Sequence, residues 1–115
     1  MTINGSCHCG AVAYTIDADS PTEAMECNCS ICRRKGYLHL FTDASGFTLV
    51  TPRDALAAYT FGKHVIRHQF CTTCGCAPFS EGEGPDGKPM MSVNLRCTDV
   101  DLSALTIKPF DGASL

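Results

Sequence analysis

"CTTCG", residues 71–75, is a C-x-x-C pair followed directly by glycine, a pattern typical of a metal-binding turn whose backbone N–H groups point at the sulfurs. The glycine permits the left-handed conformation that closes such a turn. A second cysteine pair lies far earlier in the chain, in "CHCG" (7–10). Because four thiolates saturate a structural zinc, we predict a closed site that joins the N-terminal strand to the strand ending at Phe70. This first cysteine group comprises Cys7, Cys9, Cys71 and Cys74.

A second cysteine group lies in "CNCSICRRKG" (27–36) and comprises Cys27, Cys29 and Cys32. Catalytic zinc sites keep three protein ligands and one exchangeable position. Three thiolates also donate less negative charge than four, so the ion stays a better Lewis acid. The second group therefore predicts a catalytic or exchangeable zinc.

A basic run, Arg33, Arg34 and Lys35, follows the last of these cysteines. Such a run would lower thiolate pKa values and attract an anion to the open position. A small anionic thiol fits this description, because its sulfur could bind the metal while its carboxylates meet the arginines. The alternative is that the run is only a solvated loop, as most surface charges are.

The fourth position of the second group has other candidates. Cys97 or a histidine could fill it and make this site structural too. Four histidines are scattered without a partner at ligand spacing, so a surface or core role is expected for each: His8, His39, His64 and His68. Cys76 is most simply a buried free thiol, whereas Cys97 is a candidate fourth ligand or a reactive thiol near the second site.

Composition narrows the class of protein. The chain has 115 residues, nine cysteines and a net charge of −3, so no basic excess attracts it to nucleic acid or to anionic membranes. We see no signal-peptide pattern and no apolar run long enough to span a bilayer, and expect a cytoplasmic protein. In that reducing compartment, clustered thiols are better explained as metal ligands than as disulfides.

Short runs rich in β-branched and aromatic residues, bounded by glycine and proline, predict strands. They cover 11–16, 37–42, 46–50, 64–70 and 89–95. Helical turns are expected in 52–59 and 100–105, and an ordered edge with a loose end in 107–115. These elements predict one small, mainly β domain over residues 1–115. Its core is modest, so metal binding should supply part of the folding free energy.

Four blocks, "GSCHCGAVAY", "CNCSICRRKG", "HQFCTTCGCAPF" and "VNLRCTDVDL", occur in an order and spacing that resemble the glutathione-dependent formaldehyde-activating enzyme family. Centromere protein V belongs to the same superfamily. The resemblance implies a small β-tent fold with two Zn²⁺ ions per chain, one structural and one exchangeable or catalytic. It matches the first cysteine group to the structural ligands and the second group to the ligands of the catalytic zinc. Asn28 stands where the family commonly has a histidine.

The resemblance also implies a reaction. The family is assigned as carbon–sulfur lyases that handle S-hydroxymethylglutathione, so the expected partner is a small anionic thiol such as glutathione. Two alternatives remain open. One is a non-catalytic two-zinc structural or interaction module with both sites closed. The other is a thiol-based redox or zinc-release sensor, suggested by the unassigned Cys76 and Cys97.

Overall fold

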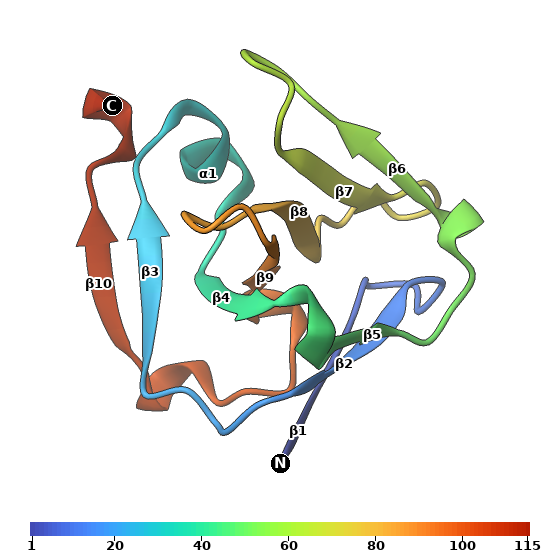
Figure 1. Ribbon diagram of the computed structural model, residues 1–115. Helices are drawn as coiled ribbons and strands as arrows, with labels where there is room; N and C mark the ends of the chain where they lie inside the picture. The colour runs from blue at the N-terminus through green and yellow to red at the C-terminus, as the bar shows by residue number, and fades with distance from the viewer.

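The computed structural model describes residues 1–115 and confirms a mainly β chain, with ten strands and one short α-helix (Figure 1). The strands are β1 Thr2–Ser6, β2 Ala13–Asp17, β3 Glu23–Cys27, β4 His39–Asp43, β5 Phe47–Leu49, β6 Leu56–Tyr59, β7 Arg67–Cys71, β8 Phe79–Glu83, β9 Pro89–Asn94 and β10 Thr106–Phe110. The helix is α1, Ser30–Lys35. Single 3₁₀ turns cover Ala44–Gly46, Arg53–Ala55, Leu95–Cys97, Leu102–Ala104 and Gly112–Ser114.

The strands form two sheets. The smaller has the order β1-β2-β5, and the larger has the order β10-β3-β4-β9-β8-β7-β6. All pairs are antiparallel except β10 with β3, which run side by side in the same direction at one edge of the larger sheet (Figure 1). This parallel pair places Phe110, near the C-terminus, opposite Cys27. The end of the chain is thereby brought to the second cysteine group.

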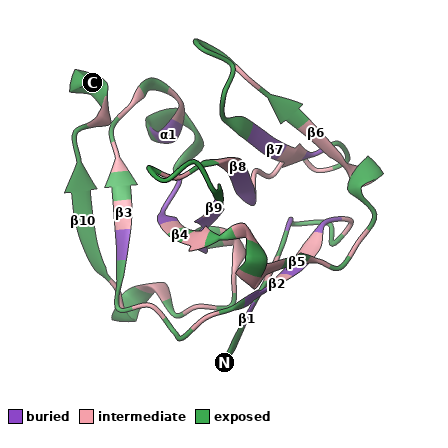
Figure 2. Ribbon diagram, in the orientation of Figure 1, coloured by how far each residue is buried: buried purple, intermediate pink, exposed green.

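The main core contains side chains from both sheets. Alternation along β2 buries Tyr14 and Ile16, as expected for a strand with one face turned inward. The Tyr14 ring packs edge-on against Phe79 of the larger sheet, with ring centroids 5.5 Å apart. The first cysteine group borders this core, since Cys7 and Cys71 belong to the same buried cluster. Burial is concentrated here, whereas the edge strand β10 is exposed throughout (Figure 2).

Most expected strands are present, with two corrections. The helical turns expected over 52–59 end at Ala55, because Leu56–Tyr59 continues as β6 and pairs with β7. The strand expected over 64–70 begins only at Arg67, because His64 has a positive φ of 57° and lies in a turn. In both segments, pairing between strands decides the conformation rather than local propensity.

The C-terminal segment is better ordered than expected. The edge strand β10 is present, but the residues after it fold into the turn Gly112–Ser114 instead of a loose end. The turn is held by hydrogen bonds that the Asn28 side chain makes with Asp111 and Ala113. No helix in the chain has both the length and the apolar character needed to cross a bilayer.

Candidate metal centres

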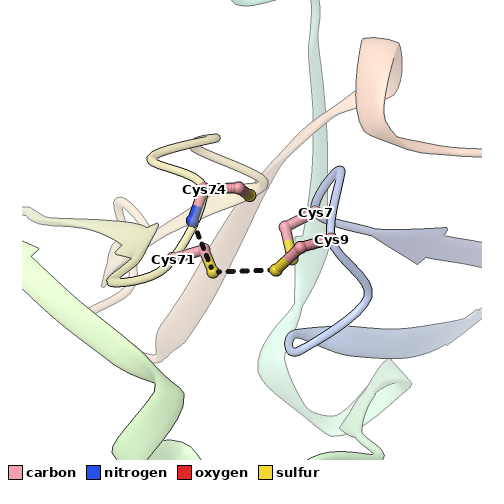
Figure 3. A group of neighbouring side chains, drawn as sticks. All are labelled: Cys7, Cys9, Cys71 and Cys74. Atoms are coloured by element: carbon pink, nitrogen blue, oxygen red, sulfur yellow. Dashed lines mark hydrogen bonds between the residues drawn. The ribbon is translucent and has the colours of Figure 1, made fainter.

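The first cysteine group joins the two sheets. Cys7 and Cys9 lie in the connection from β1 to β2, while Cys71 ends β7 and Cys74 lies in the turn after it (Figure 3). All four sulfurs lie within 4.8 Å of one another. The Cys9 sulfur is 3.6 Å from that of Cys7 and 3.6 Å from that of Cys71. These spacings match the edge of about 3.8 Å expected for a tetrahedron of thiolates around zinc, and they far exceed a disulfide bond.

Backbone N–H groups point at these sulfurs, as the "CTTCG" pattern predicts. The N–H groups of Thr73 and Cys74 donate to the Cys71 sulfur over 3.4 and 3.5 Å. Gly75 has a φ of +79° and closes the turn by donating to the Cys71 carbonyl at 2.9 Å. The backbone N–H groups of Cys76 and Cys9 lower the pKa of Cys74 to about 5. The loop therefore favours the thiolate form that a metal requires.

The second cysteine group is assembled by one short segment. Cys27 is the last residue of β3, Cys29 precedes the helix as its N-cap, and Cys32 lies one turn into α1. Their three sulfurs lie within 4.8 Å of one another, and no fourth cysteine, histidine or carboxylate joins them within that limit. Burial opposes ionisation of Cys29, but the N–H of Cys32 and the thiols of Cys32 and Cys27 outweigh it and lower its pKa. These groups belong to the loop itself rather than to the basic run.

The C-terminal segment covers one side of this group. The Asn28 side chain, between two of the cysteines, donates to Asp111 at 3.0 Å and accepts from the Ala113 N–H at 2.9 Å. Gly112 is thereby held so close to the cysteines that an added Cβ would collide with the Cys27 sulfur. Asn28 therefore ties the end of the chain over the metal side of the loop, and only glycine fits at position 112.

His39 contacts the second group, although its isolated position in the sequence favours a surface or core role. Its Nε2 lies 3.1 Å from the Cys32 sulfur, but the ring lies outside the group of three sulfurs. Burial and the nearby His68 lower the pKa of His39. The sequence feature that indicates this contact is Gly36. It ends α1 with a φ of +70°, and the chain then turns back as β4 toward Cys32.

A groove of about 640 Å³ opens beside the second cysteine group. Its lining includes Cys27, Cys32, Arg33, Arg96, Glu26 and Asp111, and we call it the Arg33 groove. Both salt bridges of the chain are made by Glu81, with Arg53 and Arg67, so the two arginines of the groove have no carboxylate partner. The Nε of Arg96 donates to the Gly36 carbonyl at 3.0 Å, which fixes the guanidinium beside the loop.

The basic run is divided between two hollows. Arg33 lines the Arg33 groove, whereas Arg34 and Lys35 line a separate hollow of about 400 Å³ with Tyr59 and Phe61. Arg34 donates to the Ser30 carbonyl at 2.9 Å, and the Lys35 ammonium lies 5.4 Å from the centre of the Phe70 ring. The structure thus places one of the three predicted anion-binding residues with the cysteines. Arg96, which lies far from the basic run in the sequence, joins it there.

Cys97 is not beside the second group, contrary to the sequence-based expectation. The thiols whose charges raise the pKa of Cys97 are Cys76, Cys7 and Cys74, after burial as the larger cause. Cys97 therefore lies near the first group, on the 3₁₀ turn that contacts β1, and is not one of its four members. Cys76 lies at the same place, directly after the metal-binding turn. Cys76 and Cys97, the two thiols without an assigned role, therefore both lie near the first cysteine group.

The remaining histidines occupy core or surface positions. His68 is buried and its Nδ1 bonds to the Ser80 hydroxyl at 3.1 Å, while burial and Lys35 lower its pKa. His64 is exposed and bonds to Thr60, and His8 is exposed in the first loop. None of these three lies in either cysteine group.

This arrangement defines a class: small, mainly β proteins with one closed and one open cysteine group, each of which could hold a metal ion. The family model named "Glutathione-dependent formaldehyde-activating enzyme" matches residues 2–109, so the chain belongs to that family. A Halomonas elongata protein provisionally named as such an enzyme is 47% identical over 34 residues, which are 30% of this chain and 22% of that protein. This match therefore spans about a fifth of the curated relative.

The fold is shared with a solved structure. The crystal structure of a Rhodobacter sphaeroides protein superposes with a TM-score of 0.78 at 30% sequence identity. The match covers 95% of this chain and 98% of the other, so the two proteins share the same overall fold.

Proposed function

We propose that this protein is a zinc-dependent carbon–sulfur lyase that acts on the hydroxymethyl adduct of glutathione or of a similar small thiol. The observation that carries the proposal is the second cysteine group, whose three sulfurs gather without a fourth protein ligand beside a groove with two unpaired arginines. The family name supports the choice of glutathione.

The residues present fit two zinc ions. Thiolate sulfur is a preferred ligand of zinc, and the sulfur spacing in the first group matches tetrahedral coordination. The first group has the four ligands of a structural site, and the second has the three of a site with an exchangeable position. Zinc bound there would supply a Lewis acid that stabilises a thiolate. In this proposal Cys27, Cys29 and Cys32 hold that ion.

The Arg33 groove suits a ligand with charges of both signs. Arg33 and Arg96 can hold carboxylates, and Glu26 and Asp111 line the same groove and can face an ammonium group. Glutathione carries two carboxylates, one ammonium group and a thiol. We assign Arg33 and Arg96 to carboxylate binding and leave Arg34 and Lys35, which line the other hollow, out of the site.

The proposed reaction breaks the bond between sulfur and the hydroxymethyl carbon. The electron pair of that bond stays on sulfur, the hydroxyl group gives up its proton to water, and the carbon leaves as formaldehyde. Formation of the adduct is the reverse. The protein orients the thiol by its carboxylates, which Arg33 and Arg96 of the groove would hold. Positioning of this kind lowers the entropic part of the barrier.

The role of the arginines is tested by calorimetry of glutathione binding to two-zinc protein. We expect Arg33→Gln and Arg96→Gln each to raise Kd about tenfold or more, because each removes a charged hydrogen-bond donor worth roughly 1.5–3 kcal/mol. Arg34→Gln is the matched control from the same helix, and we expect a change of less than about twofold because Arg34 lines the other hollow.

A second control uses S-methylglutathione, which keeps both carboxylates but cannot present a thiolate. It should bind much more weakly than glutathione. Equal binding of the two ligands, or equal losses from the Arg33, Arg96 and Arg34 variants, would refute the proposed binding mode. Absence of glutathione binding to protein with two zinc ions would favour the non-catalytic two-metal module.

A further inference from the structure

His39 makes a contact that the proposed reaction does not use. Its Nε2 lies 3.1 Å from the sulfur of Cys32, which is the buried member of the second cysteine group. On the other side of the ring, Nδ1 bonds to the Ser92 hydroxyl in the neighbouring strand β9. The imidazole thus connects a candidate metal ligand to the sheet.

The orientation of this ring is fixed by packing as well as by hydrogen bonds. Its centroid lies 5.2 Å from that of Tyr37 and 5.6 Å from that of Phe41, residues on the same side of β4 and the segment before it. His39 also has a defined register, opposite Asn94 of β9 and Met25 of β3. A ring held from several directions can place its N–H with precision.

We propose that His39 is a positioning residue for the second metal centre and acts by donating its Nε2–H to the thiolate of Cys32. A thiolate can only accept, so Nε2 is the donor in this pair. In the neutral imidazole Nδ1 must then accept, and the Ser92 hydroxyl donates to it and selects this tautomer. Hydrogen bonds of this kind orient metal ligands, and their loss typically weakens metal binding by about tenfold to a hundredfold.

The larger sheet contains a matched pair of serines. Ser92 bonds to His39, whereas Ser80, its direct cross-strand partner in β8, bonds to His68. The two serines thus occupy equivalent places in adjacent strands but serve different histidines. Of these two histidines, only His39 contacts a cysteine of the second group. A substitution of Ser92 should therefore change metal binding at that group, and a substitution of Ser80 should not.

The inference rests on the proposed metal at the second group, and its test does not use activity. Zinc affinity of that group is measured by chelator competition, and the absorption bands of cobalt bound there report the sulfur environment. We expect His39→Phe, which keeps an aromatic ring between Tyr37 and Phe41, to weaken second-site zinc binding about tenfold to a hundredfold. His39→Gln restores an N–H donor and should recover part of the affinity.

Ser92→Ala leaves the imidazole in place, so it tests the inference even if the His39 variants fail to fold. It should weaken second-site binding several-fold and shift the cobalt bands, while Ser80→Ala matches the original protein. If Ser92→Ala leaves the second-site zinc affinity and the cobalt bands unchanged, or if the two serine variants have equal effects, the proposed function stands and the inference is overturned. A protein that binds only one zinc would overturn it together with the proposed function. If Ser92→Ala weakens second-site zinc binding but the original protein does not bind glutathione, the proposed function is refuted and the inference is supported.

Discussion

A Cys71→Ser variant is expected to be unfolded at room temperature. Cys71 ends β7 and belongs to the group that joins the two sheets, and only 20 of the 115 residues are buried. Structural zinc contributes roughly 10–16 kcal/mol in small zinc domains, which is comparable to the whole stability of a domain this size. Cys71 is buried, and its sulfur accepts from two N–H groups of the turn. Serine at this position should therefore remove the metal and the fold, although the three remaining thiolates equal the number in the second group. Circular dichroism and metal content measure the two losses.

Cys76→Ser is the matched control for this prediction. Cys76 lies two positions after Cys74, directly after the same turn, but outside the group of four sulfurs. Its backbone carbonyl accepts from the Cys71 N–H, a bond that a change of side chain leaves in place. This variant should fold and bind two metals. A Cys71→Ser variant that folds as well as Cys76→Ser would show that the first group is not structural.

The second large effect is expected from the loss of a thiolate in the second cysteine group. A Cys29→Ser variant should fold, bind one metal instead of two, and lose detectable glutathione binding. The fold survives because the main core and the first group lie elsewhere in the chain. Binding fails because two thiolates are too few to hold zinc firmly. Metal analysis, thermal unfolding and calorimetry on one sample measure the three quantities.

The control for Cys29→Ser is Cys97→Ser, which removes a thiol that lies outside both groups. It should keep two metals and unchanged glutathione affinity. If Cys29→Ser retains glutathione binding after losing its second metal, the thiol does not bind at this site. If Cys97→Ser loses the second metal, the placement of Cys97 beside the first group is wrong.

The sequence predicts the two cysteine groups because their members are close in the chain or lie in recognisable turns. "CTTCG" encodes its own geometry through Gly75, and the structure shows the expected N–H donors at Cys71. The second group is likewise local, since one strand end and one helical turn supply all three sulfurs. Strand propensity and glycine boundaries also predict β2, β4, β5, β7 and β9, but not β3, β6 or β8.

What surrounds the second group could not be predicted, because it depends on pairing between distant strands. Asn28 meets Asp111 across 83 positions of sequence, and this contact requires β10 to run parallel to β3. Arg96 reaches the groove from the far end of β9. The strand expected over 37–42 does not indicate the neighbours of His39, because the contact with Ser92 requires β4 to pair with β9.

The central claim is that the second metal keeps a position open for a thiol. X-ray absorption at the zinc edge of two-zinc protein, before and after addition of glutathione, tests it most directly. We predict an average sulfur count midway between three and four without glutathione, rising to four when glutathione saturates the site, and no rise with S-methylglutathione. A count of four before any thiol is added, or a count that glutathione leaves unchanged, would contradict the account.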